Sequence, residues 1–131
     1  MKYIVDSDFL IAFTNSEDSN HSKSIKIYKH LKDKAELVVL NLVFQESTTV
    51  VSKKFGMQMA RVFYEKLTKF INTEIKIDEK LEREAWKVFL KQNKKGTSFV
   101  DCANLATHKK YKFDGILSFD KFYPKDKLVH T

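Results

Sequence analysis

Four carboxylates stand at places in the sequence where solubility alone does not explain an acid. Asp6 directly follows a short apolar run and Asp120 follows another, while Glu46 and Asp101 lie near the starts of two expected helices. Carboxylates gathered at one place repel one another, so their pKa values rise or a cation is recruited. A divalent cation held in this way can activate water and offset the charge that develops on a phosphodiester during hydrolysis.

The available donor types narrow the choice of cation. The four histidines are dispersed, and none has the HxxxH or HExxH spacing of a histidine metal site. Oxygen ligands without a Cys or His cluster suit Mg²⁺ or Mn²⁺ better than Zn²⁺. We therefore expect Mg²⁺ or Mn²⁺ as the cofactor, and its expected ligands are Asp6, Glu46, Asp101 and Asp120.

Each acid also has a purely structural explanation. Asp101 lies three residues after Ser98, the spacing of a helix capping box, and an acid in the first turn of a helix is favourable anyway. Glu46 can likewise interact favourably with the dipole of its helix, and Asp120 can begin a turn. Asp6 is the hardest to explain, because a carboxylate at the end of a buried strand normally needs a partner.

The elements expected around these acids alternate between strands and helices. Strands are expected at 3–5, 36–40, 74–77 and 115–118, with a last short one at 127–129. Helices are expected at 9–13, 19–34, 41–54, 57–70, 78–93 and 98–111, with Asn41 and Ser98 as caps. This alternation predicts an α/β fold: a three-layer α/β/α sandwich with a central parallel sheet of four to five strands. Ligands of such sheets bind beyond the carboxyl ends of the strands, where the four acids would meet.

Length and composition favour one compact domain spanning residues 1–131. The chain has the length of an ordinary domain, and its three Gly and one Pro are scattered, so no linker is evident. Asp6 and Asp8 interrupt the N-terminal apolar run, which a signal peptide would not tolerate. No run approaches the roughly 20 apolar residues of a membrane span. With Cys102 as the single cysteine, we expect a cytoplasmic protein without a membrane partner.

The net charge of +7 comes almost entirely from lysine. A basic surface attracts polyanions such as nucleic acid or anionic membrane, although solubility alone would also explain the charge. Lys109, Lys110 and Lys112 lie at or just after the carboxyl end of the expected helix that carries Asp101. They could meet RNA phosphates or simply favour the carboxyl end of that helix.

The four acids and their neighbours lie in three segments: 4–12 (IVDSDFLIA), 40–46 (LNLVFQE) and 98–122 (SFVDCANLATHKKYKFDGILSFDKF). These segments resemble PIN-domain ribonucleases, especially the VapC-type toxins of toxin–antitoxin pairs. The last one has the family's order of an acid, a helix with small residues, an apolar strand and a Ser/Thr-x-Asp ending. Taken in order, these segments span nearly the whole chain.

The resemblance implies a metal-dependent endoribonuclease that hydrolyses RNA and leaves 5′-phosphate and 3′-hydroxyl ends. The family's metal-site acids fall on Asp6, Glu46, Asp101 and Asp120, and its hydroxyl falls on Ser118, which would orient a carboxylate or a water. Asp8 would be an outer-shell group, and Asp114, near the start of its strand, a turn acid. An antitoxin protein is implied as a partner.

A homodimer is also expected. Family resemblance points to two-fold pairing, and several apolar residues on the expected helices could remain after the core is filled: Tyr28, Leu31, Phe63, Phe70 and Trp86.

Two alternatives remain open at this stage. Asp6-Ser7-Asp8 after an apolar strand also fits a haloacid-dehalogenase-type phosphatase, in which Asp6 would be the nucleophile. However, Phe9-Leu10 departs from that motif, and no late Gly-Asp-x-x-x-Asp follows. The second alternative is a non-catalytic PIN-like scaffold that binds RNA or protein. Such a scaffold would not need all four acids, so their presence favours an enzyme.

Overall fold

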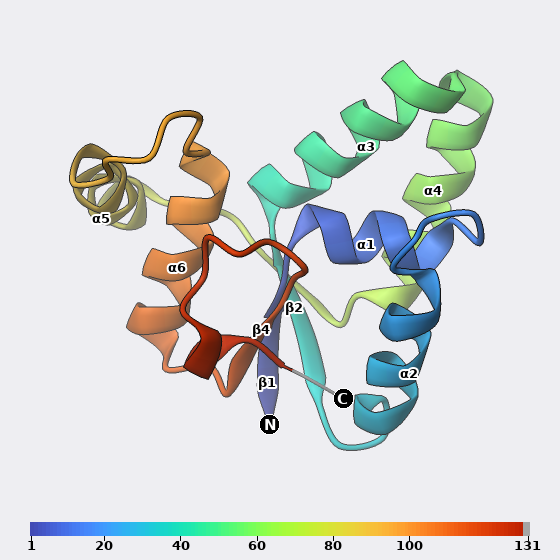
Figure 1. Ribbon diagram of the computed structural model, residues 1–131, viewed down its shortest axis with the longest axis horizontal. Helices are drawn as coiled ribbons and strands as arrows, with labels where there is room; N and C mark the ends of the chain where they lie inside the picture. The colour runs from blue at the N-terminus through green and yellow to red at the C-terminus, as the bar shows by residue number, and fades with distance from the viewer. Residues whose placement is uncertain (130–131) are drawn as a thin grey trace.

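The computed structural model describes residues 1–129 and contains one parallel sheet of four strands. The strands are β1 (Lys2–Val5), β2 (Glu36–Leu40), β3 (Thr73–Ile75) and β4 (Gly115–Leu117). Their order across the sheet is β3-β2-β1-β4, and all three neighbouring pairs are parallel. Ile4 lies opposite Val38 on one side and Ile116 on the other, so β1 is a central strand (Figure 1).

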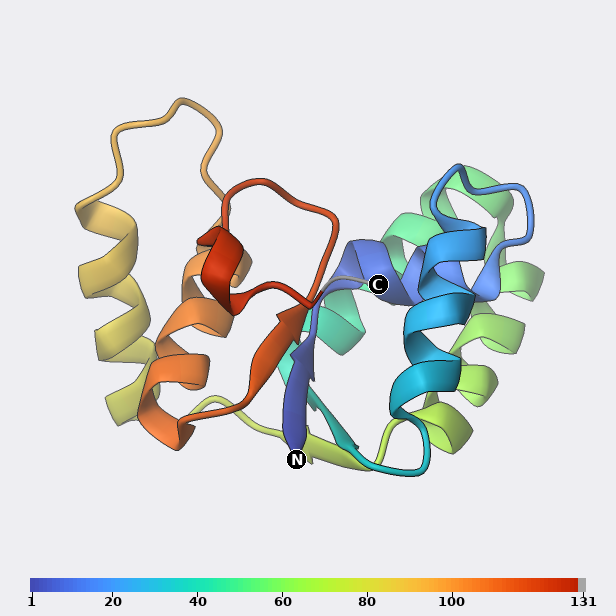
Figure 2. The same ribbon diagram turned by 60° about the horizontal axis from the view of Figure 1, so that its bottom comes forward.

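Six α-helices cover the sheet in two layers. They are α1 (Ser7–Thr14), α2 (His21–Leu31), α3 (Asn41–Phe55), α4 (Met57–Phe70), α5 (Glu79–Leu90) and α6 (Phe99–Tyr111). Figure 2 shows α5 and α6 on one side of the sheet and α1 to α4 on the other. The predicted three-layer α/β/α sandwich with a parallel sheet is therefore confirmed.

The central strands are buried because their side chains are apolar on both faces. Ile4 and Val5 of β1 are completely buried, as are Val39 and Leu40 of β2. This pattern is the one expected for parallel strands with helices on both faces. The rigid core that results fixes the carboxyl ends of β1, β2 and β4, which carry the loops and helix starts of interest.

Two local predictions were wrong. Asn41 does not cap α3: it is the first residue of the helix, and its side-chain oxygen accepts a hydrogen bond from the backbone N–H of Ile77 (2.9 Å). The side chain therefore ties α3 to the segment after β3. The expected last strand at 127–129 is reduced to one bridge between Leu128 and Ile116, because a 3₁₀ turn (Lys125–Lys127) occupies its start.

Two glycines mark places where a side chain would not fit well. Gly56 separates α3 from α4 with a φ of +89°, a backbone conformation that L side chains rarely adopt. Gly115 begins β4 beneath the C-terminal segment, where an added Cβ would lie 3.0 Å from Val129 and 3.2 Å from Tyr3. Within residues 1–129, none of the helices combines the length and apolarity needed to cross a membrane.

Candidate active site at the carboxyl edge of the sheet

The sheet brings the four predicted acids to one edge. Asp6 follows β1 and caps α1, and its backbone N–H donates to the carbonyl of Leu117 at the end of β4 (3.0 Å). Glu46 lies in α3, the helix that follows β2 directly, and Asp101 lies in the first turn of α6. Asp120 follows β4. The acids are thus held by segments far apart in the sequence.

Asp6 is the innermost of the four carboxylates, with 3% of its surface exposed. Its Oδ1 accepts from the backbone N–H of Ser7 (2.8 Å) and from Nδ2 of Asn104 (3.2 Å). Its Oδ2 accepts from the hydroxyl of Ser118 (3.0 Å). Burial, and then the nearby charges of Asp8 and Asp101, hold the pKa of Asp6 well above its ordinary value despite these hydrogen bonds.

Asp101 is also buried and is positioned by the start of α6. The Ser98 hydroxyl caps this helix by accepting from the N–H groups of Val100 (3.1 Å) and Asp101 (3.4 Å). Burial raises the pKa of Asp101 to about 7, and the charge of Asp120 is the next cause. Asp101 and Asp120 lie close enough to share a hydrogen bond, which holds the proton on Asp101 further.

Glu46 and Asp120 are only partly buried and complete the rim of the site. One oxygen of Glu46 accepts from the Ser7 hydroxyl (2.8 Å), which links α3 to the start of α1. Asp120 accepts from the backbone N–H of Phe122 (2.9 Å) in a tight turn, and its own N–H donates to the Ser118 hydroxyl (3.0 Å). The turn proposed for Asp120 is therefore present together with its place at the acidic edge.

Ser118 and Asp8 tie the segment after β4 to α1. The Ser118 hydroxyl lies within hydrogen-bonding distance of Asp6 (3.0 Å) and of Asp8 (3.2 Å). Asp8 also accepts from the backbone N–H of Phe119 (3.1 Å). Burial is the largest influence on Asp8 and raises its pKa, while these hydrogen bonds lower it. Both oxygens of Asp8 accept hydrogen bonds from Ser118 and Phe119, which agrees with the expectation that Asp8 supports the metal ligands and does not bind the ion itself.

Sequence reasoning missed three polar residues that connect the acids. Asn104 is fully buried and donates to Asp6 and to the hydroxyl of Tyr123 (3.1 Å). The Tyr123 hydroxyl in turn donates to Asp101 (3.2 Å). Burial, followed by the charges of Asp6 and Asp101, raises the pKa of Tyr123 so far that it remains a neutral donor. The third residue is Ser7, through its hydrogen bond to Glu46.

The oxygen-rich edge has the right donors for a hard cation but is not gathered into a finished binding site. Among residues 1–129, no three acidic, histidine or cysteine side chains are clustered at metal-binding spacing, and the ion pairs of this part of the chain lie elsewhere. Ser7, Asn104 and Tyr123 donate hydrogen bonds to Glu46, Asp6 and Asp101 respectively. Oδ1 of Asn104 is buried and lacks a hydrogen-bond partner among the described residues. Mutually repelling carboxylates beside an unsatisfied oxygen fit a divalent cation chemically.

The other residues considered in the sequence lie away from this chemistry. Asp114 is at the opposite end of β4, where it accepts from the backbone N–H of Lys2 (2.8 Å), as expected for a turn acid. Cys102 is buried beside Asp101, and burial raises the pKa of its thiol, which disfavours a thiolate nucleophile. His108 is half-buried, and burial lowers its pKa.

Fold and site together define a PIN-like arrangement, and the sequence pattern of the PIN domain matches residues 3–125. The chain therefore belongs to the PIN domain family. Two solved structures illustrate its particular relatives. The VapC20 toxin of Mycobacterium tuberculosis, a Sarcin-Ricin loop cleaving toxin, is 20% identical with a TM-score of 0.81, over 92% of this chain and 91% of that one.

The second structure is the VapBC2 complex of Rickettsia felis bound to a DNA fragment from its promoter. One of its chains is 13% identical with a TM-score of 0.75, and the match covers 98% of both chains. A comparison with curated proteins gives no significant match. The resemblance to VapC-type PIN domains that the sequence predicted is confirmed at the level of family and fold.

Proposed function

We propose that this chain is a metal-dependent endoribonuclease that hydrolyses RNA phosphodiester bonds, and that it is the toxin of a toxin–antitoxin pair. The observation that carries the proposal is the meeting of Asp6, Asp101 and Asp120 from three distant segments, with Glu46 beside them. Burying acids that raise one another's pKa destabilises the fold, and such groups are commonly found at functional sites.

Each residue has a distinct part in this proposal. Asp6, Asp101 and Asp120 would hold Mg²⁺ or Mn²⁺ directly or through water, and Glu46 would complete the site. The bound ion would lower the pKa of a water and offset charge on the phosphate under attack. Ser118 would keep Asp6 in place through its hydroxyl. Tyr123 would orient Asp101 in the same manner.

The geometry around Asp6 disfavours the phosphatase alternative. A nucleophilic aspartate needs a free oxygen facing the substrate. The Asp6 side chain is almost fully buried, which leaves little space for a covalently attached phosphoryl group. We expect no phosphoryl group on Asp6 after incubation with small phosphate esters, and mass spectrometry of the intact protein measures this.

The decisive experiment is cleavage of a mixed set of structured RNAs with Mn²⁺, with Mg²⁺ and with EDTA. We expect cutting with either metal, loss of cutting in EDTA, and products with 5′-phosphate ends. Asp6→Asn serves as the inactive control, because it removes a proposed ligand with little change in shape. Undiminished cutting in EDTA by protein shown to be metal-free would contradict the metal mechanism.

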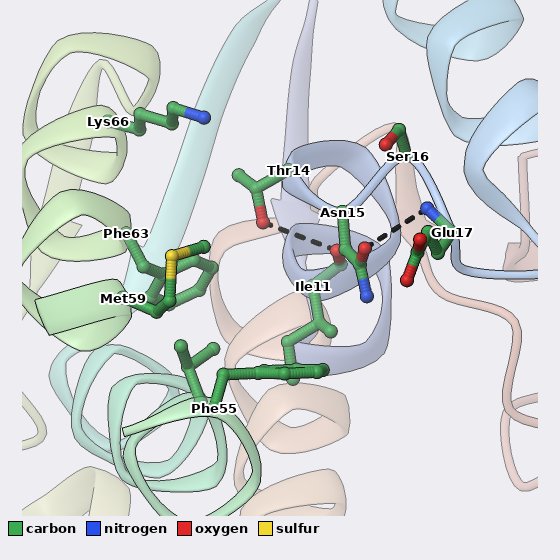
Figure 3. Close-up of a pocket in the computed structure, with 10 residues that line it drawn as sticks. Ile11, Thr14, Asn15, Ser16, Glu17, Phe55, Met59, Phe63 and Lys66 are labelled. Atoms are coloured by element: carbon green, nitrogen blue, oxygen red, sulfur yellow. Dashed lines mark hydrogen bonds between the residues drawn. The ribbon is translucent and has the colours of Figure 1, made fainter. Parts of the chain in front are cut away.

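An antitoxin partner is proposed on two grounds: the VapBC relative, and an apolar groove that lies beside the carboxyl end of α1. The groove has a volume of about 250 Å³ and lies between the end of α1, the end of α3 and α4 (Figure 3). Ile11 and Phe63 contribute to its lining, and Phe55 and Met59 remain about half exposed there. Exposed apolar surface of this kind tends to be covered by a partner.

A homodimer is proposed as well, although the residues expected to form its surface are mostly in the core. Leu31 and Phe63 are buried, and Tyr28 and Phe70 pack against Phe13. Among the five expected residues, only Trp86 is exposed. Five other exposed apolar side chains lie on α3 and α4, and they are Phe55, Met57, Met59, Val62 and Tyr64. Leu90 and Tyr111, at the ends of α5 and α6, are exposed as well. Light scattering at micromolar concentration tests the dimer, and a monomer mass would contradict it.

A further inference from the structure

The side of the molecule formed by α5 and α6 carries a lysine-lined groove that the candidate active site does not use. Its first part has a volume of about 430 Å³, and its floor consists of Leu81, Val88 and Ala106. The lysines along it are Lys80, Lys87, Lys91, Lys109 and Lys110. We name this hollow, together with its continuation past the end of α6, the α5/α6 groove.

The groove continues past the end of α6. A second hollow of about 590 Å³ shares Val88, Ala106 and Lys109 with the first, and it adds Lys112 and Lys127 to the lining. Seven lysines from α5, α6 and the C-terminal segment therefore line one continuous depression. All of them except the partly buried Lys127 are exposed, so their charges face solvent.

The lysines of α5 form a regular row. Lys80, Lys87 and Lys91 are spaced by seven and four residues, which places them on one stripe of the helix. At 1.5 Å per residue the row is roughly 16 Å long. A row of this length presents several point charges to an extended ligand.

Few negative charges oppose these lysines. Glu84 is the acid that lines the groove, and it pairs with Lys87 (3.2 Å). Asp78 lies near Lys80 and Lys110 at one end, and Asp126 and Asp114 lie near His108 at the other. Lys110 also lies over the ring of Tyr111, at 5.2 Å from its centroid. The lining of the groove remains strongly positive, in contrast to the acidic edge.

The groove also leads toward the proposed active site. Pro124 and Lys127 line its far end, and they belong to the same short segment as Asp120 and Tyr123. Across that segment lies another hollow of about 590 Å³, and its lining includes Ser118 and Asp120 together with Lys23 and Lys121. Lysines therefore stand on both sides of the segment that carries the last catalytic acid.

We propose that the α5/α6 groove is an RNA-binding surface, separate from the catalytic edge, that holds the phosphate backbone of the substrate away from the cleaved bond. This inference rests on the proposed function for the identity of its ligand. Lysines act as point charges that contact phosphates without reading sequence, and the floor of the groove offers no hydrogen-bonding side chains for base edges. A concave row of charges fits a ridged polyanion better than a flat membrane surface.

The test is a charge-matched pair of triple variants. One carries Lys80→Gln, Lys109→Gln and Lys110→Gln in the groove, and the other carries Lys26→Gln, Lys29→Gln and Lys32→Gln. The second set lies on α2 and at the residue that follows it, on the opposite side of the sheet, and is exposed as well. Both variants lose three positive charges, so a difference between them reports position and not net charge. Circular dichroism checks that both are folded.

RNA binding is measured in EDTA, where cleavage does not complicate the measurement, over a series of salt concentrations. We expect the groove variant to bind a structured RNA roughly tenfold more weakly, with a salt slope smaller by about 2 if each lost lysine contacts one phosphate. The α2 variant should stay within about twofold of wild type. Equal weakening in the two variants would overturn the proposal, and so would unchanged RNA binding together with lost binding to phosphatidylserine vesicles.

Cleavage kinetics separate this inference from the proposed function. With Mn²⁺ we expect the groove variant to show a KM about tenfold higher on the structured RNA, with unchanged kcat and unchanged turnover of an RNA only a few nucleotides long. If wild type cuts no RNA but the groove variant still loses RNA binding selectively, the nuclease proposal fails and the groove stands. If wild type cuts RNA and both triple variants bind and cut equally well, the groove proposal fails alone.

Discussion

The acidic edge and the α5/α6 groove hold opposite charges in opposite ways. At the edge, Asp6 and Asp101 are buried and each accepts hydrogen bonds from neighbouring side chains. In the groove, lysines such as Lys80 and Lys109 are exposed. The carboxylates of the edge are therefore held in fixed positions in which they repel one another, while the lysine side chains of the groove are free to move in solvent.

This difference corresponds to what the two regions are proposed to do. Hydrolysis requires groups held in place before the substrate arrives, because reorganisation during the reaction is costly. Holding a phosphate backbone requires only charge density, since phosphates recur along the strand. Single substitutions should consequently have large effects at the edge and small, additive effects in the groove.

The largest effect is expected from Asp101→Asn. Loss of outer-shell partners of metal ligands typically costs 10- to 100-fold in activity, so loss of a ligand should lower kcat with Mn²⁺ by more than about 100-fold. Single-turnover cleavage of a labelled RNA measures this. Asp33→Asn, at an exposed acid beyond α2, is the matched control and should retain wild-type rates. Wild-type turnover in Asp101→Asn would remove this residue from the site.

The second prediction concerns the stability of the metal-free protein as a function of pH. The pKa of Asp101 is about 7 in the folded chain and near its ordinary value of 3.8 in the unfolded chain, so the folded state retains a proton that the unfolded state releases. The free energy of unfolding should therefore fall as pH rises from about 4 to about 7, by on the order of 2 kcal/mol, which is about half of what the full pKa shift would give because solvent partly screens this carboxylate. Denaturant unfolding in EDTA at several pH values measures it.

Comparison with Asp101→Asn isolates this contribution from that of other acids. The variant cannot ionise at this position, so its stability should decline less over the same interval, and near pH 7.5 it should exceed that of wild type. Parallel pH profiles for the two proteins would mean that burial and the charge of Asp120 do not raise the pKa of Asp101 in the metal-free folded state.

Tyr123→Phe should have an intermediate effect. The change removes the hydroxyl that joins Asn104 to Asp101 while leaving the buried ring in place. We expect a loss of about 1 kcal/mol in stability and about tenfold in turnover. Thermal melting and steady-state kinetics measure the two effects. Tyr111→Phe is the control, because that ring is 46% exposed and lies at the far end of α6. The same result in both variants would exclude an orienting role for Tyr123.

The smallest effect is expected from Lys109→Gln, which changes one lysine shared by both parts of the groove. RNA affinity should fall only two- to threefold, and the slope of log affinity against log salt should fall by about 0.7. Fluorescence anisotropy with labelled RNA is sensitive enough for this difference. Lys29→Gln on α2 should leave the slope unchanged. A loss of kcat in Lys109→Gln would contradict the separation of the two regions.

Much of the fold and the placement of the acids could be predicted because strong local signals carry them. An apolar run ending in an acid identifies β1 and Asp6, and the rule for parallel sheets then brings Asp101, Ser118 and Asp120 to the same edge. Gly56 ended its helix as expected because its φ of +89° suits glycine. The roles of the acids as ligands stay predictions.

The connecting residues were missed because their partners are distant in sequence. Tyr123 lies in a segment without periodicity, 22 residues from Asp101, and nothing in its neighbourhood marks it as a donor. Asn104 carried a usable signal, since it lies three residues after Asp101 and therefore on a neighbouring part of the same helix face. The error at Asn41 has a similar origin, because its bond to Ile77 depends on tertiary structure.

The central position of β1 has a consequence for synthesis. Translation adds residues from the N-terminus at about 5–20 per second, so Asp6 precedes Asp120 by roughly 6 to 23 seconds. Throughout that interval β1 lacks its neighbour β4, because the order β3-β2-β1-β4 places the first strand made beside the last. Pairings between such distant segments also form late in folding. A nascent chain attached to a ribosome, which is itself largely RNA, would thus carry no complete acidic edge until Asp120 had been made.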